Sequence, residues 1–415
     1  MKVVVLGGGV VGITTAWFLA QDGHEVEVVE RHDRLAQDAS SGNAGLIAPG
    51  HSFAWASPAA PRMLVHSLRG AETAIRVKPR LDPELVRWGL RFLRECPSGP
   101  ARRNTLIKLR LCQYSQGILD QLTEQEALDY GPRAKGILYL YRDEAELEAG
   151  MRKMALLQEH GQEQELLDAD GVARHEPSLA PVMDRIAGAV LGKTDSSGDS
   201  ELFTNALAER CRQLGVRIRL GAAVHRLEAD GARVTGAVID GGTLRADAFV
   251  LALGVDSPRV ARTAGQRLPI YPAKGYTATF PIRDGDTPPA LGGIDEGTLV
   301  AWSSFGDRLR MSSTAEFAGH ARDWAERDFN NIMKTARELL PDAADYDAGR
   351  FRACLRPMTP DGPPILGFGR QSNLLYNTGH GHMGWTMACG TAKIAADLLA
   401  RRTPDLPLEG MGVRS

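Results

Sequence analysis

A glycine-rich turn near the amino end constrains the fold of this chain more than any other feature. Residues 2–6 form a short apolar run typical of a buried strand, and residues 10–21 have the pattern of a helix. Gly7, Gly9 and Gly12 form Gly-x-Gly-x-x-Gly between them, and residues 25–30 have the pattern of a second strand. The segment is therefore predicted to be a βαβ unit.

Each glycine of the motif has a physical role in binding a dinucleotide. The first permits a tight turn, the second lets the backbone approach a pyrophosphate, and the third lets helix and strand pack closely. The phosphates then lie at the positive helix N-terminus, and Glu30 can accept hydrogen bonds from ribose hydroxyls while repelling a 2′-phosphate. A glycine-rich turn without a ligand is the alternative. The cofactor residues predicted in this unit are Gly7, Gly9, Val10, Val11, Gly12, Glu30 and Arg31.

The sequence after Glu30 favours FAD over NAD. A nicotinamide-dependent enzyme normally continues with further βα units, whereas small residues follow here at 40–45. They let backbone reach the far end of a longer cofactor, and a later strand, 248–253, also ends in small residues. The cofactor residues predicted in these regions are Ser41, Asn43, Ala44, Gly45, Leu46, Val224, Ala252 and Gly254.

Length and composition limit the remaining possibilities. A chain of 415 residues exceeds the usual size of one domain, so we expect two lobes. Forty-nine basic and 51 acidic residues give no electrostatic reason to expect nucleic acid as a partner. The five scattered cysteines predict neither a disulfide framework nor a metal site, and they suit a reducing cytoplasm. No apolar run reaches the roughly 18 residues that cross a bilayer.

The order of strand and helix patterns predicts an α/β fold in which one lobe is assembled from three separated pieces. We expect a Rossmann-like FAD-binding domain at residues 1–57, 191–265 and 351–415. An α+β substrate domain, inserted at residues 58–190 and 266–350, forms the second lobe of this predicted flavoprotein.

Six segments resemble the D-amino-acid oxidase superfamily of FAD-dependent oxidoreductases, and within it the small subunit of bacterial D-amino-acid dehydrogenases. They are VVVLGGGVVGITTAWFLA, SSGNAGLIAPG, GDSELFTNALA, YPAKGY, LRPMTPDGPPILG and NTGHGHMGWTMACG. The resemblance covers nearly the whole chain. It implies noncovalent FAD and oxidative deamination of a small D-amino acid, by hydride transfer from Cα to flavin N5. The resulting imine hydrolyses to a 2-oxo acid and ammonia. Glycine and sarcosine oxidases are similar relatives, and a nicotinamide-dependent dehydrogenase is a weaker alternative.

Arg356, in Leu-Arg-Pro-Met, is the residue predicted to bind the substrate carboxylate. A guanidinium grips both carboxylate oxygens in a plane, which orients the Cα hydrogen. The resemblance implies the same role for this arginine. A structural ion pair is the alternative.

The segment from Asn377 to Thr386 leads from a predicted strand into the last helix. Its glycine-rich N-terminus offers free N–H groups and a positive dipole end toward the flavin. His382 stands where the nearest relatives have another residue, and we expect it to face the cavity. No general base is assigned, because a neutral amine can release a hydride without one. The cofactor residues predicted here are Gly379, Gly381, Met383, Gly384, Trp385 and Thr386.

Two positions depart from the dehydrogenase pattern. His51 and Thr298 stand where relatives have tyrosines that plausibly line the substrate pocket. His51 titrates near neutrality and could bind a polar substrate group, or it could be a solvated loop residue. The changes suit a cyclic imino acid, such as D-hydroxyproline or D-proline, as an alternative substrate. Cys354, two residues before Arg356, matches the position that bonds flavin covalently in sarcosine oxidases, although a buried free cysteine is the more common reading.

The predicted helix at residues 83–96 is amphipathic and carries Arg87, Arg91 and Arg94. A basic amphipathic face could touch the inner face of the cell membrane, where a dehydrogenase passes electrons to quinone. A lid helix with a solvated basic edge is the interpretation we favour. The electron acceptor, a quinone or another redox protein, stays open.

Overall fold

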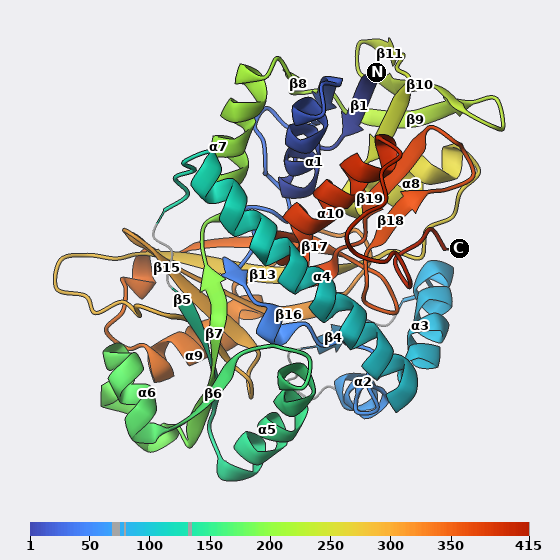
Figure 1. The fold of residues 1–415 in the computed structure, drawn as a ribbon. Coiled ribbons are helices and arrows are strands. Elements are labelled where there is room, and N and C mark those ends of the chain that lie inside the picture. The colour runs from blue at the N-terminus through green and yellow to red at the C-terminus, as the bar shows by residue number, and fades with distance from the viewer. Residues whose placement is uncertain (69–74, 79, 132–134, 415) are drawn as a thin grey trace.

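The computed structural model describes residues 1–68, 75–78, 80–131 and 135–414. In these residues a six-stranded sheet with its helices forms the upper half of the molecule in Figure 1, and a larger sheet forms the lower half. The smaller sheet is parallel except for β18, which pairs antiparallel with β19. Its strands, in spatial order, are β18 (Ile365–Phe368), β19 (Leu374–Thr378), β12 (Ala248–Leu251), β1 (Lys2–Leu6), β2 (Glu25–Val29) and β8 (Arg217–Arg219).

The alternation of side chains in β1 explains why its apolar run is continuous. Val3 and Val5 point to one face of the sheet and join the core of the helical layer. Val4 and Leu6 point to the other face and join a second core. Because both faces are covered, a strand at this position needs apolar residues throughout.

The two faces of the small sheet are covered by different elements. The core on one face is shared with the helices α1 (Val10–Gln21), α4 (Ser98–Gln125), α7 (Ser200–Gln213) and α10 (Gly384–Leu399). The core on the other face is shared with the three-stranded sheet β9 (Val224–Ala229), β10 (Val234–Ile239) and β11 (Gly242–Leu244) and with α8 (Ser257–Thr263).

The larger sheet has ten strands and is mainly antiparallel. Eight lie in the order β17 (Arg350–Met358), β13 (Tyr271–Pro281), β16 (Arg308–Phe317), β15 (Val300–Phe305), β14 (Gly292–Asp295), β5 (Lys135–Tyr141), β7 (Gly188–Ser197) and β3 (Leu46–Ile47). The other two are β4 (Ile75–Val77), paired with β16, and β6 (Gln164–Asp168), paired with β7.

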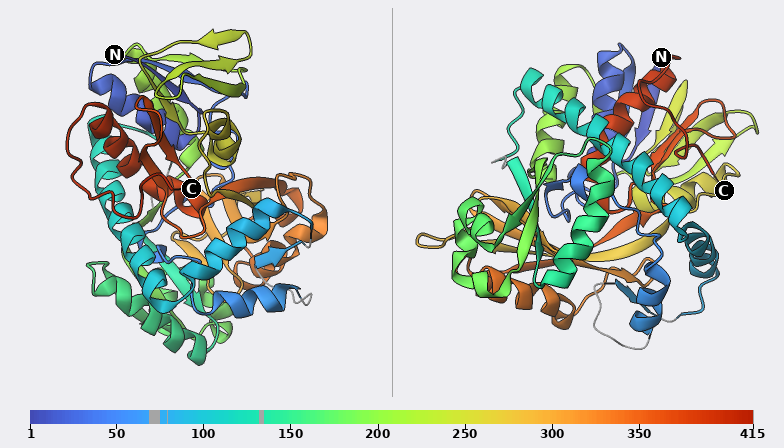
Figure 2. Two further views of the ribbon diagram at one scale, coloured as in Figure 1. Left: turned by 90° about the vertical axis from the view of Figure 1, so that its right-hand side faces the viewer. Right: turned by 60° about the horizontal axis from the view of Figure 1, so that its bottom comes forward.

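Further helices surround the larger sheet, and the views in Figure 2 place α2 and α3 together at one end of it. They are α2 (Ala60–Leu68), α3 (Pro83–Glu95), α5 (Glu144–Gln158), α6 (Ala169–His175) and α9 (Asn330–Leu339). Short 3₁₀ turns are η1 (Pro49–His51), η2 (Pro177–Arg185), η3 (Gly254–Asp256), η4 (Glu326–Phe329), η5 (Tyr346–Ala348) and η6 (Gly381–Met383).

The predicted α/β class and the opening βαβ unit are confirmed. The helix predicted at residues 83–96 forms as α3, and its N-cap is Asp82, whose side chain accepts hydrogen bonds from the N–H groups of Glu84 and Leu85. α9 begins at Asn330, because the chain first makes the 3₁₀ turn η4, closed by a hydrogen bond from the Ala325 N–H to Asp328.

The domain boundaries stay a prediction, and two of them cut through strands of the larger sheet. The boundary between residues 190 and 191 lies inside β7. The boundary between residues 350 and 351 lies inside β17, which pairs with β13 of the expected substrate domain. In the described part of the chain no helix is both long and apolar enough to cross a bilayer.

Candidate active site

A cavity of about 2090 Å³ is lined by residues of both sheets. Pockets for small ligands usually hold roughly 300–1,000 Å³, so this cavity has room for a long cofactor and a substrate together. The β1–α1 turn lines one part of it, and β17, the η1 turn and the start of α10 line another. The geometry therefore joins the predicted cofactor and substrate residues in one space.

The glycines of the β1–α1 turn are needed for close backbone packing. Gly7 has φ +118°, and a Cβ there would lie 2.4 Å from the carbonyl oxygen of Ala252. A Cβ on Gly12 would lie 1.9 Å from the carbonyl oxygen of Gly7. Gly9 is the N-cap of α1 and has no side chain with which to cap its first turn. The turn is thus a backbone cradle at a helix N-terminus, where the Val10 N–H donates to a loop side chain, Ser40 Oγ at 3.0 Å, and such a cradle suits a pyrophosphate.

Glu30 is buried at the end of β2 and is held by two backbone donors. The N–H of Gly8 donates to Oε2 at 2.8 Å, and the N–H of His32 donates to Oε1 at 2.9 Å. A carboxylate oxygen has more than one acceptor position, so each can still receive a ribose hydroxyl. The neighbouring Arg31 forms ion pairs with Asp38 and Asp256 at the wall of the cavity.

Segments far apart in the chain meet where the flavin end of FAD is expected. The Ala48 N–H donates to Thr386 Oγ at 3.3 Å, which ties the first loop to the start of α10. The loop, the cradle and the glycine-rich helix start together fit FAD. The predicted cofactor residues that line the cavity are Gly7, Gly9, Val10, Val11, Glu30, Arg31, Asn43, Ala44, Leu46, Val224, Ala252, Gly254, Gly381, Met383, Gly384, Trp385 and Thr386.

Four predicted cofactor residues do not line the cavity and pack around it. Gly12 makes the helix–strand contact described above, and Ser41 accepts a hydrogen bond from Arg352. A Cβ on Gly45 would lie 2.1 Å from the Phe305 ring. Gly379 has φ +78°, and a Cβ there would lie 2.9 Å from Thr359 Cγ2. These residues shape the cavity without facing it, and the roles of all the predicted site residues stay predictions.

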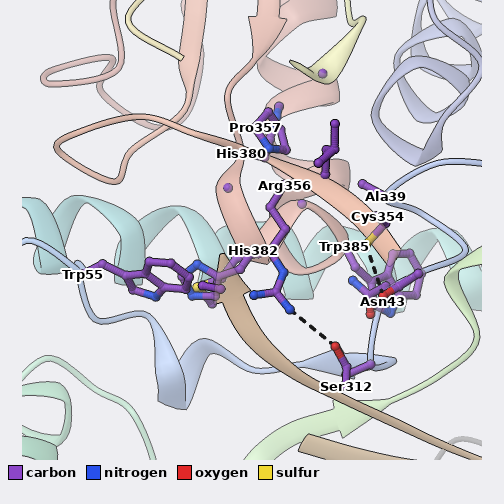
Figure 3. A pocket seen from close by; sticks show the side chains of 18 of the residues that line it. Ala39, Asn43, Trp55, Ser312, Cys354, Arg356, Pro357, His380, His382 and Trp385 are labelled. Atoms are coloured by element: carbon purple, nitrogen blue, oxygen red, sulfur yellow. Dashed lines mark hydrogen bonds between the residues drawn. The ribbon is translucent and has the colours of Figure 1, made fainter. Parts of the chain in front are cut away.

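Arg356 on β17 projects into the cavity. Its guanidinium lies against the backbone of Gly275 on β13, where a Cβ would be 2.5 Å from Nη2. Nη2 donates to Ser312 Oγ at 3.4 Å (Figure 3). Burial lowers the pKa of Arg356, yet an arginine remains charged in proteins. The arrangement places a fixed cation where a carboxylate can bind.

His382 lies between Arg356 and Trp55 (Figure 3). Its ring stacks on the Trp55 ring, with the centroids 4.7 Å apart and the planes at 24°. Burial, together with the nearby charges of Lys108 and Arg356, holds the pKa of His382 well below its usual value. The imidazole is therefore neutral at physiological pH and extends the flat wall that Trp55 begins.

His51 lines the cavity and is already engaged by a carboxylate. Its Nε2 lies 2.9 Å from Glu296 Oε1, and Lys153 Nζ lies 3.6 Å from the other oxygen of Glu296. Although burial opposes it, the charges of Lys153 and His51 lower the pKa of Glu296 to about 2. Thr298, the other departure from the dehydrogenase pattern, also lines the cavity and donates to Asp295 Oδ2 at 2.8 Å.

A buried pair of polar side chains supports the His51 turn. The Tyr139 hydroxyl donates to Asp195 Oδ2, and the N–H of Gly50 donates to Asp195 Oδ1 at 3.0 Å. The Tyr139 ring also stacks on His51, with the centroids 5.6 Å apart. Burial raises the pKa of Asp195 to about 6, although these hydrogen bonds act in the opposite direction.

Cys354 lines the cavity against the backbone of Gly42, where a Cβ would lie 2.6 Å from its Sγ. Burial raises the pKa of the Cys354 thiol, so the nucleophilic thiolate is disfavoured. We expect a noncovalent cofactor. Acid precipitation of the holoprotein should leave the yellow colour in the supernatant, and colour retained in the pellet would show a covalent bond.

Sequence reasoning missed Phe53, Trp55 and Ser312, which all line the cavity. The alternation of His51, Phe53 and Trp55 with small residues is a period-two pattern that indicates one extended face. That signal was available in the sequence. No sequence signal predicts the contact of Ser312 with Arg356, because this contact depends on the pairing of strands that are distant in the chain.

Comparisons with known proteins agree with this geometry. The model of the family described as FAD dependent oxidoreductase matches residues 2–398. The chain is 43% identical over 412 residues to D-amino acid dehydrogenase 2 of Mesorhizobium japonicum, covering 99% of each chain. It is 40% identical to a D-amino acid dehydrogenase of Vibrio cholerae, covering 100% of this chain and 98% of that protein. The structure of glycine oxidase from Geobacillus kaustophilus superposes with a TM-score of 0.78 at 21% identity, covering 100% of this chain and 98% of the other, and shows the same fold.

Proposed function

Because the chain belongs to the family of FAD-dependent oxidoreductases, we propose that it oxidises the Cα–N bond of a D-amino acid. The product is an imine, which water hydrolyses to a 2-oxo acid and ammonia. FAD, when bound, supplies the acceptor for the hydride that leaves Cα. The observation that carries the proposal is a fixed cation, Arg356, inside the cavity that the dinucleotide cradle also lines.

The chain's own residues bind and orient the substrate in this proposal. Arg356 grips the carboxylate, and its seat against Gly275 restricts how the guanidinium can turn. The neutral ring of His382 and the half-buried Trp55 cover one side and exclude water. Positioning and electrostatics supply the rate, without an assigned general base.

Two relatives with full-length similarity, both named as D-amino acid dehydrogenases, favour a D-amino acid as substrate. A cyclic imino acid, such as D-hydroxyproline or D-proline, is the second candidate. It is favoured by the placement of His51 and Thr298, the two departures from the dehydrogenase pattern, on the cavity wall. A glycine or sarcosine type of oxidase is the weaker alternative.

An anaerobic bleaching screen tests the function. The purified holoprotein is mixed without oxygen with D- and L-amino acids and proline derivatives, and the flavin absorbance is followed. We expect D-amino acids to bleach it and L-amino acids to leave it unchanged. Slow recolouring in air then indicates a dehydrogenase and rapid recolouring an oxidase. Failure of every D-amino and imino acid to bleach the flavin would contradict the proposal.

We propose that the electron acceptor is a quinone or another redox protein that approaches over α3. The inner side of this helix lines the cavity through Leu85, Trp88 and Phe92. Its outer side exposes Val86 and Leu90, which are 60% and 58% accessible. Arg87, Arg91 and Arg94 lie on the same helix, so the face suits an anionic lipid surface.

A further inference from the structure

The segment from His51 to Trp55 presents three aromatic rings to the cavity, and we call it the aromatic strap. His51, Phe53 and Trp55 line the cavity and are only half-buried, whereas the intervening Ser52 and Ala54 are buried. Because large apolar rings are usually packed away from solvent, rings left half-buried on a cavity wall offer binding surface to a ligand.

The strap is held in place from behind by α4. Lys108 is buried and its Nζ donates to the carbonyl oxygen of Phe53 at 2.8 Å. Thr105 Oγ accepts from the N–H of Ala54 at 3.1 Å. Two of the three strap rings also have a stacking partner, because Trp55 stacks on His382 and His51 stacks on Tyr139. The wall is therefore held in position by contacts that need no ligand.

The Phe53 ring packs among apolar side chains and against one lysine. Leu156, Ile294 and Ala301 belong to the same hydrophobic cluster as Phe53, and all three line the cavity. Lys153 Nζ lies 4.2 Å from the centroid of the Phe53 ring, a cation–π contact.

The carboxylate at this wall is already paired. Glu296 is in contact with His51 at 2.9 Å and with Lys153 at 3.6 Å. A substrate with a charged side chain would compete with contacts that already exist, whereas an uncharged ring would not disturb them. The wall thus favours an apolar side chain over a basic or acidic one.

We propose that the aromatic strap is a side-chain subsite that selects amino acids with an aromatic side chain over alanine. The inference rests on the proposed function for the placement of the carboxylate on Arg356. From that cation, His382 and then Trp55 follow in a row (Figure 3), so a substrate fixed by its carboxylate can extend its side chain along the strap.

Two carboxylic acids without an amino group test the subsite apart from turnover. 3-Phenylpropanoate is phenylalanine without its amine, and propanoate is alanine without its amine, so neither can be deaminated. Their dissociation constants for the FAD-loaded protein are measured by isothermal titration calorimetry. We expect 3-phenylpropanoate to bind at least about tenfold more tightly, because its ring buries apolar surface against the strap.

Variants assign this preference to the strap. Phe53→Ala and Trp55→Ala should each reduce the preference by about threefold to tenfold, because each removes a ring that 3-phenylpropanoate contacts and propanoate is too short to reach. Trp55→Phe keeps a ring and should retain most of it. Phe368→Ala, an exposed aromatic position outside the cavity, is the matched control and should retain all of it. Thermal unfolding and flavin content confirm that each variant is folded.

Equal affinities of the wild-type protein for the two acids would overturn the subsite, as would a preference that survives the double variant Phe53→Ala/Trp55→Ala. The proposed function fails separately. If the strap-dependent preference is measured and no D-amino acid bleaches the flavin, the subsite stands and the deamination proposal does not.

Discussion

Single residues decide how the cavity meets a charged ligand. Arg356 carries its charge into a space lined mainly by backbone, aromatic rings and aliphatic side chains. The guanidinium can lie in this position only because Gly275 has no Cβ there. A small residue on one strand thus sets the geometry of a charged residue on the next.

Replacing Arg356 by leucine tests the carboxylate site. Loss of a paired, charge-assisted interaction should raise KM by roughly 100-fold while FAD is retained. Arg356→Lys should lose less, since it keeps the charge but not the planar grip. Steady-state kinetics and the flavin spectrum provide the measurements. An unchanged KM in Arg356→Leu would remove this residue from the substrate site.

Asp195 should make stability depend on pH. Its pKa is raised to about 6 in the folded protein, so between about pH 4 and 6 the folded chain holds a proton that the unfolded chain has lost. The free energy of unfolding therefore falls as the pH rises through this window, by up to about 3 kcal/mol. Asp195→Asn cannot ionise and should escape this loss.

Thermal unfolding of the wild-type protein and Asp195→Asn, with FAD in excess, checks this from pH 4 to 7. The Tm of the variant should rise relative to that of the wild-type protein as the pH increases. Asp33→Asn, at a position with an exposed side chain, is the control and should follow the wild-type curve. Parallel curves for Asp195→Asn and the wild-type protein would contradict the assignment.

At the scale of elements, helix α3 has one face toward the cavity and one exposed face. Trp88 and Phe92 are buried and line the cavity, while Val86, Leu90 and Leu93 are exposed on the other side. The spacing of three and four residues places each set on one face of the helix. The outer face therefore exposes apolar side chains beside the arginines. The lid interpretation explains the first face, and the proposed contact with a lipid surface would account for the second.

Co-sedimentation with vesicles tests the outer face of α3. The triple variant Arg87→Gln/Arg91→Gln/Arg94→Gln should reduce binding to phosphatidylglycerol vesicles by up to roughly 100-fold, since each arginine near an anionic surface contributes about 1 kcal/mol. The matched control replaces Arg226, Arg233 and Arg245, which lie on or beside the three-stranded sheet, by glutamine. Equal loss in both triple variants, or no binding by the wild-type protein, would contradict a lipid-facing α3.

At the scale of the whole molecule, the cavity lies between the six-stranded and the ten-stranded sheet. Its wall combines the β1–α1 turn, η1, β17 and the start of α10. Contacts such as that between Ala48 and Thr386 bring segments 338 residues apart to the same place. A cofactor bound along this wall would bridge these segments, so it should stabilise the native chain as a unit.

Removal of FAD measures that stabilisation. The apoprotein should unfold at a lower temperature than the holoprotein, and FAD at 100 times its Kd should restore about 2.7 kcal/mol. NAD at the same concentration should restore little. Differential scanning calorimetry provides the measurement, and identical transitions with and without FAD would contradict the assigned cofactor site.

Much of this molecule follows from local sequence. The apolar run of β1, the three glycines and Glu30 predict a βαβ unit, because backbone sterics and helix dipoles act over a few residues. The Asp82 cap of α3 is equally local. In these places the sequence alone determined both the element and the chemistry of the FAD cradle.

Other features were decided by the tertiary structure. β7 continues past the expected domain boundary, and His51 meets Glu296, because strand pairing and ring stacking join residues far apart in the chain. The contact of Arg356 with Gly275 and the stacking of Trp55 on His382 also join residues that are distant in the chain. The sequence determined that a dinucleotide is bound, since that depends on short-range backbone geometry. Which side chains surround the substrate depends on long-range packing, and only the folded chain decided it.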